Sequence, residues 1–372
     1  MNLIGLFMTN KKITFLGLNG RGGTLQYSSN LVSYMSKHSN VALLLPSYSD
    51  TSLISKKVKL IRITAPPSAL KTLFLTINIF AHIKTIKSIN NTNSEIIDFL
   101  DIHPWYVLYW PFLKGKKYVT INDPEPHAGE AGLFTLLMIK FVTKFLLKRA
   151  DKIIVLGSKQ ELILRQLGYK QEIIVSRIGS YDFFNKYSNK KYKTEPQSIL
   201  FFGRIKLYKG LDYLLDALIE LKHSGSENNF KLIIAGEGDI SVYWKKLLLL
   251  GESVELHNGY IGDEDVNKYF QRAAFIVMPY IEATQTGVVQ VAYSFKKPVI
   301  ATNVGSLPEV VINKKTGIII EPKNVNQLKR AMITLLKNPK LAKKYGQNSY
   351  NFMKKELDWK KIVKKLVEDF NN

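Results

Sequence analysis

Short runs of uncharged apolar residues recur along the chain, and most of them end at a turn with glycine, proline or polar residues. Longer stretches with apolar residues at helical spacing lie between these runs. This alternation is typical of βαβ units, whose parallel strands are buried on both faces. The chain is therefore predicted to be an α/β protein with strands at 12–17, 41–45, 58–64, 95–100, 117–121, 153–156, 172–175, 198–202, 231–235, 254–256, 274–278 and 299–301.

The periodic pattern is interrupted in a charged segment near the middle of the chain. Residues 180–197 lose apolar periodicity and gain charge, and a chain of 372 residues is long enough for two domains with separate cores. We therefore expect an N-terminal domain at 1–180, a linker at 181–197, a C-terminal domain at 198–355 and a C-terminal helix at 356–372.

The turn after the apolar run 274–278 is the first candidate site. Pro279 and Tyr280 end this strand, and the polar segment 284–287 leads to an apolar helical face that begins at Val288. The first turn of a helix has unpaired N–H donors, so an anion is favoured there. A turn without a ligand would have the same pattern, because such turns are common in α/β folds.

A second candidate site follows the strand 198–202. This strand runs into Gly203-Arg204, and Lys209-Gly210 follows a few residues later. Two cations at the carboxyl end of a strand could straddle a diphosphate, with Arg204 as a bidentate fork and Lys209 as a point charge. Two neighbouring anion sites on one sheet favour a phosphorylated ligand more strongly than either turn alone.

The first half of the chain has weaker candidates. Gly22 and Gly23 lie between a strand and an amphipathic helix, which allows close approach to an anion or a sugar. Their loop matches neither the dinucleotide-binding nor the P-loop fingerprint. Carboxylates and His127 crowd the segment 122–130 after another strand. The aromatic segment 101–110 could form a sugar-binding wall, but we favour a position in the core.

Basic residues outnumber acidic residues by 53 to 30, which gives a net charge of +23. Such an excess suits a polyanion, an anionic membrane or a phosphorylated ligand, although compositional drift could also scatter lysines in this way. No nucleic-acid-binding motif accompanies the charge, so nucleic acid is not an expected partner. The helical pattern at 133–149 has Lys140, Lys144 and Lys148 at four-residue spacing. It fits a helix on anionic lipid and a core-packed helix with a solvated lysine face equally well.

The absence of cysteine excludes disulfides, thiolate nucleophiles and cysteine-bound metals, and it is compatible with a reducing cytosol. The N-terminal sequence is a poor signal peptide, and the longest uncharged apolar stretch, 72–83, is too short to span a bilayer. We expect a cytoplasmic protein, or one that lies on a membrane without crossing it. The acidic run 263–265 is better explained as the first turn of a helix than as a metal site, and no metal site is predicted.

Three motifs, Gly203-Arg204…Lys209-Gly210, Ala235-Gly236-Glu237-Gly238 and the stretch 279–309, together resemble the donor domain of glycosyltransferase family 4. Members of this family are nucleotide-sugar enzymes of the GT-B architecture. The resemblance implies two Rossmann-like domains that face each other across a cleft and a C-terminal helix that crosses back to the first domain. It also implies a metal-independent hexosyltransferase that retains the anomeric configuration and needs no cofactor besides its nucleotide-diphosphate sugar.

The resemblance gives roles to matching positions of this sequence. Arg204 and Lys209 would hold the donor diphosphate. The same phosphates would contact the Gln-Thr-Gly-Val signature, which consists of Gln285, Thr286, Gly287 and Val288. Tyr260 and Ile261 would line the nucleobase slot, and Gly22 and Gly23 would let the first domain approach the phosphate and the sugar.

Two positions depart from the family pattern. The family often has two glutamates separated by seven residues; Glu282 matches the first, but Gln290 stands at the second, which leaves the ribose contact of that acid open. Counted back from Pro298, the two positions are instead Ala283 and Val291. The family also commonly has a His-Asp pair where this chain has Asn122-Asp123. His127 is the nearest candidate for a functional imidazole, and Glu282 and His127 complete the candidate catalytic set with Arg204 and Lys209.

The resemblance implies sugar transfer from a nucleotide-diphosphate sugar to a glycan acceptor. A lipid-linked acceptor in surface polysaccharide biosynthesis, for lipopolysaccharide or capsule, would suit a basic first domain on the inner face of the plasma membrane. The alternatives are a nucleotide-sugar epimerase of the same fold, a basic nucleic-acid-binding protein and an inactive glycosyltransferase-like scaffold.

Overall fold

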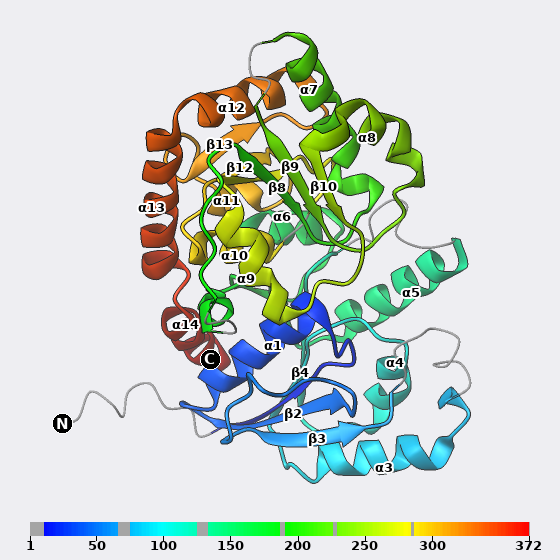
Figure 1. Ribbon diagram of the computed structural model, residues 1–372. Helices are drawn as coiled ribbons and strands as arrows, with labels where there is room; N and C mark the ends of the chain where they lie inside the picture. Colours follow the sequence, from blue (N-terminus) through cyan, green and yellow to red (C-terminus); the bar gives the residue numbers. More distant parts are fainter. Residues whose placement is uncertain are drawn as a thin grey trace, which may run out of the picture. The chain divides into compact units, whose positions relative to one another are not determined.

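The computed structural model describes residues 11–65, 75–124, 133–186, 190–225, 229–283 and 286–371. The chain divides into two compact units. The first unit contains the described residues up to Ile178 together with Trp359–Asn372, and the second contains Gly179–Asp358. Each unit is built on an open parallel sheet with helices packed against it, which confirms the predicted pair of Rossmann-like α/β domains (Figure 1).

The first unit has a seven-stranded sheet in the order β3-β2-β1-β4-β5-β6-β7, and all its neighbouring strands pair in parallel. The strands are β1 (Lys12–Leu16), β2 (Asn40–Pro46), β3 (Lys59–Ile63), β4 (Ile96–Phe99), β5 (Lys116–Ile121), β6 (Lys152–Val155) and β7 (Glu172–Val175). The helices are α1 (Gly22–Met35), α3 (Ile79–Asn90), α4 (Trp105–Tyr109), the 3₁₀ turn η2 (Trp110–Phe112), α5 (Leu133–Arg149), α6 (Ser158–Gln166) and α14 (Trp359–Asn371).

The aromatic segment after β4 packs into the core of the first unit, as we expected. Trp105, Tyr106 and Tyr109 on α4 are all at most 2% exposed. The Tyr106 ring packs edge-on against Phe99 with ring centroids 4.9 Å apart. These rings are therefore buried packing groups and not an open sugar-binding wall.

The C-terminal helix α14 belongs to the first unit, where it packs on α1. Its apolar residues Ile362, Val363, Leu366, Val367 and Phe370 recur at helical spacing and are buried. The Trp359 ring lies against two rings of α1, with centroid distances of 5.7 Å to Tyr27 and 6.3 Å to Tyr34. The chain thus returns to its first unit after completing the second, as predicted.

The second unit has a six-stranded parallel sheet in the order β10-β9-β8-β11-β12-β13. The strands are β8 (Ser198–Phe202), β9 (Lys231–Ala235), β10 (Val254–His257), β11 (Phe275–Met278), β12 (Val299–Thr302) and β13 (Gly317–Ile320). The sequence pattern did not indicate β13. The α-helices are α7 (Leu211–His223), α8 (Trp244–Leu250), α9 (Asp263–Arg272), α10 (Val288–Ser294), α11 (Leu307–Val310), α12 (Val325–Lys337) and α13 (Pro339–Glu356).

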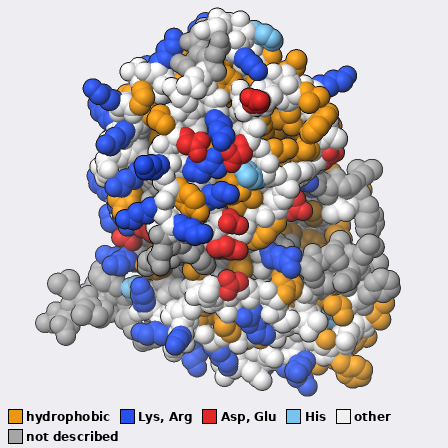
Figure 2. Space-filling model, viewed as in Figure 1, with side chains coloured by type: hydrophobic (Ala, Val, Ile, Leu, Met, Phe, Trp, Pro, Cys, Tyr) orange, Lys and Arg blue, Asp and Glu red, His pale blue; other side chains and the backbone are white. Residues whose placement is uncertain are grey.

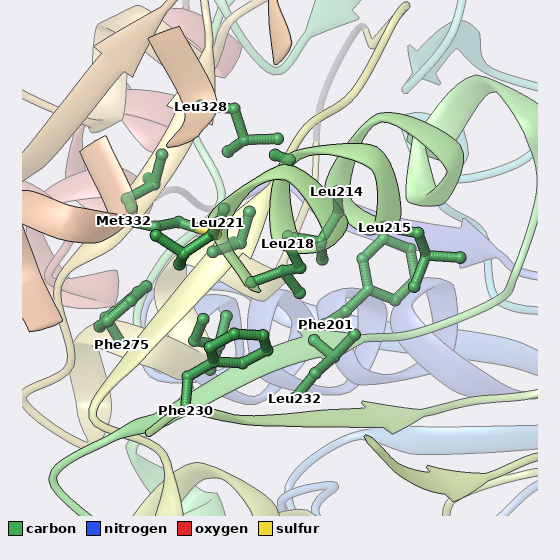
Figure 3. Close-up of a cluster of buried hydrophobic side chains, with 14 of the residues drawn as sticks. Phe201, Leu214, Leu215, Leu218, Leu221, Phe230, Leu232, Phe275, Leu328 and Met332 are labelled. Carbon is green, nitrogen blue, oxygen red and sulfur yellow. The ribbon is translucent and has the colours of Figure 1, made fainter. Parts of the chain in front are cut away.

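Leucines of α7 form the centre of the core in the second unit. Leu214, Leu218 and Leu221 recur at helical spacing and are fully buried between the sheet and α12 (Figure 3). They pack against Phe201 of β8 and Met332 of α12 (Figure 3). This packing fixes the direction of α7 and therefore the position of the loop that connects it to β8.

The segment that we predicted as a linker is part of the second unit. It contains the 3₁₀ helix η3 (Asp182–Lys186), which contacts α9 and α10. Tyr181 is 1% exposed, and the Asn185 side-chain amide donates to the Ser294 carbonyl at 3.1 Å. A single 3₁₀ turn is too short to give a periodic apolar pattern, which is why the segment resembled a loop.

Candidate functional site

In each sheet the strand order reverses between two neighbouring strands, which are the first and the fourth of that unit along the chain. These pairs are β1 and β4 in the first unit and β8 and β11 in the second. In open α/β sheets, ligands bind outside the carboxyl ends of the strands at such switch points. The two loops that the sequence singled out in the second half follow β8 and β11, so they begin at the same switch point.

The loop after β8 is shaped by glycines at both ends. Gly203 has a φ of +101°, and a Cβ atom there would lie 3.1 Å from the Lys209 Nζ atom. Lys209 itself is only 8% exposed, because its side chain folds back toward Gly203. Gly210 has a φ of +68° and faces the Pro279 carbonyl oxygen so closely that a Cβ atom would overlap it. The loop therefore packs directly on the chain that leaves β11.

Tyr280 brings the predicted anion-binding residues together. It is 2% exposed, and the Lys209 Nζ atom lies 5.2 Å from its ring centroid. Burial raises the pKa of Tyr280, while the Thr286 hydroxyl and the Arg204 charge oppose this shift. The backbone N–H of Ile281 donates to the Tyr208 carbonyl at 2.7 Å and joins the two loops. Lys209 thus lies over this buried ring, and Arg204 and Thr286, which the sequence placed in separate motifs, act electrostatically on its hydroxyl.

The Thr286–Val288 turn is held from two sides. The Val288 N–H donates to the Thr286 hydroxyl at 3.2 Å. Gly287 has an ordinary φ of −79°, but a Cβ atom there would lie 2.6 Å from the Tyr181 ring. The helix α10 that follows has seven residues, so its dipole is small and anion binding would rest on the cations and local N–H groups.

Gln290 lies beneath this turn and is fully buried. With the amide assigned so that its nitrogen faces these acceptors, the side chain donates to the Thr286 carbonyl at 2.8 Å and to the Gly287 carbonyl at 3.3 Å. Sequence reasoning treated this position as a missing acid, and the structure gives it a role in the turn. Tyr280, Tyr181 and Gln290 all support the site, and neither tyrosine carried a recognisable motif signal.

The loops after β9 and β10 complete the same edge of the sheet. Gly236 approaches the Gly203 carbonyl too closely for any Cβ atom, and the Gly259 N–H donates to the Gly236 carbonyl at 3.3 Å. Tyr260 and Ile261 follow β10, two strands away from β8. Tyr260 is 66% exposed and Ile261 is half-buried. They remain predicted nucleobase contacts, at the same edge as Arg204 and Lys209.

The switch point of the first unit contains the predicted glycine loop. A Cβ atom on Gly22 or Gly23 would meet nothing within 4 Å, so packing does not require glycine at either position. The loop is anchored one turn earlier, where the Asn19 N–H donates to the Asp101 carboxylate at 2.5 Å. Burial raises the pKa of Asp101 to about 6, although the Asn19 N–H and the Tyr106 hydroxyl stabilise its charge.

The other residues that the sequence singled out lie on other loops or outside the described residues. Asn122 follows β5 in the first unit, and its carbonyl accepts from the Gln160 side chain at 2.6 Å. Glu282 is exposed on the loop after β11. His127 and Gln285 lie outside the described residues. Within the parts of the chain that are described, no three histidine or acidic side chains are grouped as metal ligands, and no helix combines the length and apolar content needed to cross a bilayer.

Comparison with known proteins finds a similarity that includes the second unit and its candidate site. Residues 183–352 match the family model of glycosyl transferases group 1. An uncharacterized glycosyltransferase of Methanocaldococcus jannaschii is 29% identical over 270 residues, which cover 70% of this chain and 64% of the relative. The chain thus spans just under two thirds of the length of that relative.

Two solved structures show the same fold over almost the whole chain. Sucrose-phosphate synthase of Thermosynechococcus elongatus has a TM-score of 0.78 at 19% identity and covers 97% of this chain and 98% of its own. HepE of Anabaena, in complex with UDP and glucose, has a TM-score of 0.73 at 16% identity and covers 98% and 100%. The protein thus has a GT-B-type fold. Residues 183–352 of its second unit are similar to the group 1 glycosyltransferases.

Proposed function

We propose that this protein is a retaining, family 4 glycosyltransferase that moves a hexose from a nucleotide-diphosphate sugar to a glycan acceptor. The observation that carries the proposal is the convergence of the loops that hold Arg204, Lys209 and Thr286, which follow β8 and β11 and pack on each other at the switch point of the second sheet. The group 1 match includes these residues, and HepE, a structural neighbour, binds UDP and glucose. Both findings support a nucleotide-sugar donor.

The two cations have complementary roles in the proposed reaction. The bond between the anomeric carbon and the diphosphate breaks, and the departing diphosphate gains negative charge. Arg204 is exposed and offers a bidentate fork, while Lys209 is held in place against Tyr280. Fixed charges are most effective where transition-state charge develops, so we expect loss of either cation to lower kcat by ~10²–10³-fold.

The finer features of the reaction follow from the resemblance to family 4. We propose that the anomeric configuration is retained and that Arg204 and Lys209 supply the positive charge for which other enzymes use a divalent metal. Retention is checked by comparing the anomeric configuration of donor and product by NMR. Activity that persists in the presence of EDTA would support the proposed metal independence, and activity that EDTA abolishes would contradict it.

We propose a lipid-linked acceptor in surface polysaccharide biosynthesis, on the inner face of the plasma membrane. The support is the net charge of +23, which suits a substrate carried on a lipid phosphate. A radiolabelled transfer assay with lipid extracts tests this part separately from the donor site. Product that partitions into the organic phase supports it, and a product found only in the aqueous phase contradicts it.

The donor site is tested by thermal stability against a panel of nucleoside diphosphates. A ligand at a hundred times its Kd stabilises the folded protein by about 2.7 kcal/mol, which is a measurable shift in Tm. We expect one nucleotide to raise Tm for the wild type and for Arg330→Ala, whose exposed side chain lies on α12 and not on the loops after β8 and β11. Arg204→Ala should lose the shift.

Failure of every nucleotide to raise Tm would overturn the donor-site proposal, as would an Arg204→Ala variant that responds like the wild type. Conversion of the donor sugar without transfer to any acceptor would indicate an epimerase of the same fold. Nucleotide binding without either reaction would indicate an inactive scaffold.

A further inference from the structure

Large apolar side chains are exposed on α3 of the first unit. Phe80 is 86% exposed and Ile83 is 43% exposed, and Lys84 and Lys87 continue the same exposed stripe at helical spacing. Ile79, beside this stripe, is 66% exposed. The opposite face of the helix is buried through His82, Thr85 and Ile89. The helix therefore packs on the core with one face and presents apolar and basic residues on the other.

The helix α5 repeats this arrangement. Leu137 and Phe141 are 58% and 62% exposed, and Lys140, Lys144 and Lys148 lie on the same exposed stripe. Val142, Leu146 and Leu147 are buried in the core of the first unit. The sequence left open whether this lysine face is merely solvated. A solvated lysine face does not need a phenylalanine and a leucine exposed within it.

The elements α3, α4–η2 and α5 are neighbours. His82 of α3 bonds the Tyr109 hydroxyl of α4 at 2.8 Å, and Trp110 of η2 packs on Phe145 of α5 with ring centroids 6.2 Å apart. Between the two helices, Leu108 and Phe112 are 46% and 62% exposed. We call the exposed side chains of these elements the α3–α5 surface. Figure 2 shows hydrophobic side chains gathered beside lysines and arginines over α3, at the lower right.

The charged side chains on the elements of the α3–α5 surface are all positive. None of its elements, α3, α4, η2 and α5, contains aspartate or glutamate. A hollow of about 580 Å³ lies beside α5, and lysines border it on both sides: Lys140, Lys144 and Lys148 from α5, and Lys170 from the turn after α6. Several ammonium groups around one hollow suit a phosphate group.

We propose that the α3–α5 surface docks on an anionic phospholipid bilayer, with Phe80, Phe141 and their apolar neighbours inserted at the level of the head groups. A lipid phosphate would occupy the lysine-lined hollow. Helices that lie on membranes combine exposed apolar residues with lysines on their polar face in this way. Nucleic acid would use the lysines but leave the apolar side chains exposed to water. An acidic protein partner is the remaining alternative. The vesicle experiment below distinguishes it, because a surface made for such a partner alone would not bind anionic vesicles.

This inference rests on the proposed lipid-linked acceptor, because docking would bring the enzyme to the surface where that acceptor lies. It does not depend on the donor site, since all its residues belong to the first unit and the donor residues belong to the second. The two proposals can therefore fail separately.

The experiment is co-sedimentation of the full-length protein with vesicles of phosphatidylcholine alone and of phosphatidylcholine mixed equally with phosphatidylglycerol. We expect binding to the anionic vesicles only. Phe141→Glu should lower the partition coefficient by about tenfold or more, because it removes an inserted ring and adds a repelled charge. Phe80→Glu should act similarly. Lys144→Gln should lower the partition coefficient by about fivefold.

Matched controls come from the second unit. Leu248 on α8 is 64% exposed, close to the 62% of Phe141, so Leu248→Glu makes the same charge change at an equally exposed apolar position. The nearby lysine Lys246 is paired with Asp212 and Asp216 of α7, so acidic side chains lie beside α8 and offset part of its positive charge. Lys343→Gln on α13 is the control for Lys144→Gln. We expect both controls to bind vesicles within about twofold of the wild type.

Three outcomes would overturn the docking proposal. One is the absence of binding to anionic vesicles. Another is equal loss of binding in Leu248→Glu and Phe141→Glu. The third is concentration-dependent self-association that Phe141→Glu abolishes, which would make the surface a contact between protein molecules. The nucleotide-induced Tm shift of Phe141→Glu should equal that of the wild type, so a failed docking surface is distinguishable from a failed donor site.

Discussion

The Gln290 side chain faces the Thr286 carbonyl oxygen, and the amide orientation that satisfies the hydrogen bonds places its nitrogen as a donor 2.8 Å from that oxygen. The same nitrogen lies 3.3 Å from the Gly287 carbonyl, and no part of the side chain is exposed to solvent. Because both neighbours are acceptors, the position requires a donor. An ionised carboxylate there would face two carbonyl oxygens at a position closed to solvent. The turn therefore needs a hydrogen-bond donor at position 290. Gln290 supplies it and so positions Thr286 and Gly287.

Gln290→Glu should lower stability in a pH-dependent manner. The buried carboxyl would need to stay protonated, so its pKa in the folded protein would rise above the ordinary value near 4.3. Stability would then be retained at low pH and lost as the pH rises through the folded-state pKa. The Tm deficit should therefore be larger at pH 8 than at pH 5.

The matched variant is Gln290→Met, which has a similar volume but no donor. It should lower stability by about 1–3 kcal/mol at both pH values, because it removes the side-chain donor to the Thr286 and Gly287 carbonyls. A Gln290→Glu protein with the same Tm deficit at both pH values would contradict the hydrogen-bonding role of this amide.

Gly203→Ala should disturb both stability and nucleotide binding. The alanine would be strained at a φ of +101°, and its Cβ atom would lie 3.1 Å from the Lys209 Nζ atom. We expect a loss of about 1–2 kcal/mol in the free energy of unfolding and a weaker nucleotide-induced Tm shift. Gly225→Ala is the control, because Gly225 has a φ of +63° but nothing within 4 Å of a Cβ atom. Equal nucleotide responses of the two variants would show that Gly203 does not position Lys209.

Gly287→Ala should destabilise the protein through a single clash. The backbone φ of −79° suits alanine, but the new Cβ atom would lie 2.6 Å from the Tyr181 ring. Overpacking of this kind costs about 1–3 kcal/mol. In a double-mutant cycle with Tyr181→Leu, the combined loss should be smaller than the sum by about 1 kcal/mol or more, because the clash is then absent. Additive losses, measured by urea unfolding, would contradict this account.

Much of the fold could be predicted from the sequence because buried parallel strands are short, uncharged and apolar. The segments at β7, β8 and β9 were predicted with the bounds that the structure has. The strand β13 was missed, although Gly317–Ile320 is apolar, because the run is short and follows charged residues. The segment 180–197 was interpreted as a linker because one 3₁₀ turn has no detectable period.

The candidate site was predictable where side chains with distinctive chemistry followed a strand, as Arg204 and Lys209 do after β8. It was not predictable where ordinary residues act through packing. Nothing in the sequence distinguishes Tyr280 from the many other tyrosines, yet it lies between Lys209 and the Thr286 turn. The position of Gln290 relative to two carbonyls depends on the tertiary structure and is not visible as a pattern. The roles of the individual site residues therefore stay predictions, and the variants above test them.

Asp98 in the centre of β4 should make the stability of the first unit depend on pH. It is fully buried, and both carboxylate oxygens lie 3.0 Å from the Thr120 hydroxyl. Burial raises the pKa of Asp98 to about 7, and the hydrogen bonds to Thr120 only partly oppose this shift. The unfolded chain ionises near 3.8, so folding takes up a proton between about pH 4 and pH 7. Stability from this group is therefore complete below that window and lost as the pH rises through it.

Asp98→Asn should remove this dependence, because asparagine is neutral at every pH. Its stability relative to the wild type should increase as the pH rises from 4 to 8, by up to about 4 kcal/mol. Glu252→Gln, an exposed neutralisation in the second unit, is the control and should leave the pH profile unchanged. Scanning calorimetry across this range measures both profiles. Parallel profiles for Asp98→Asn and the wild type would show that Asp98 is already ionised in the folded protein at low pH, stabilised by its neighbours in spite of burial.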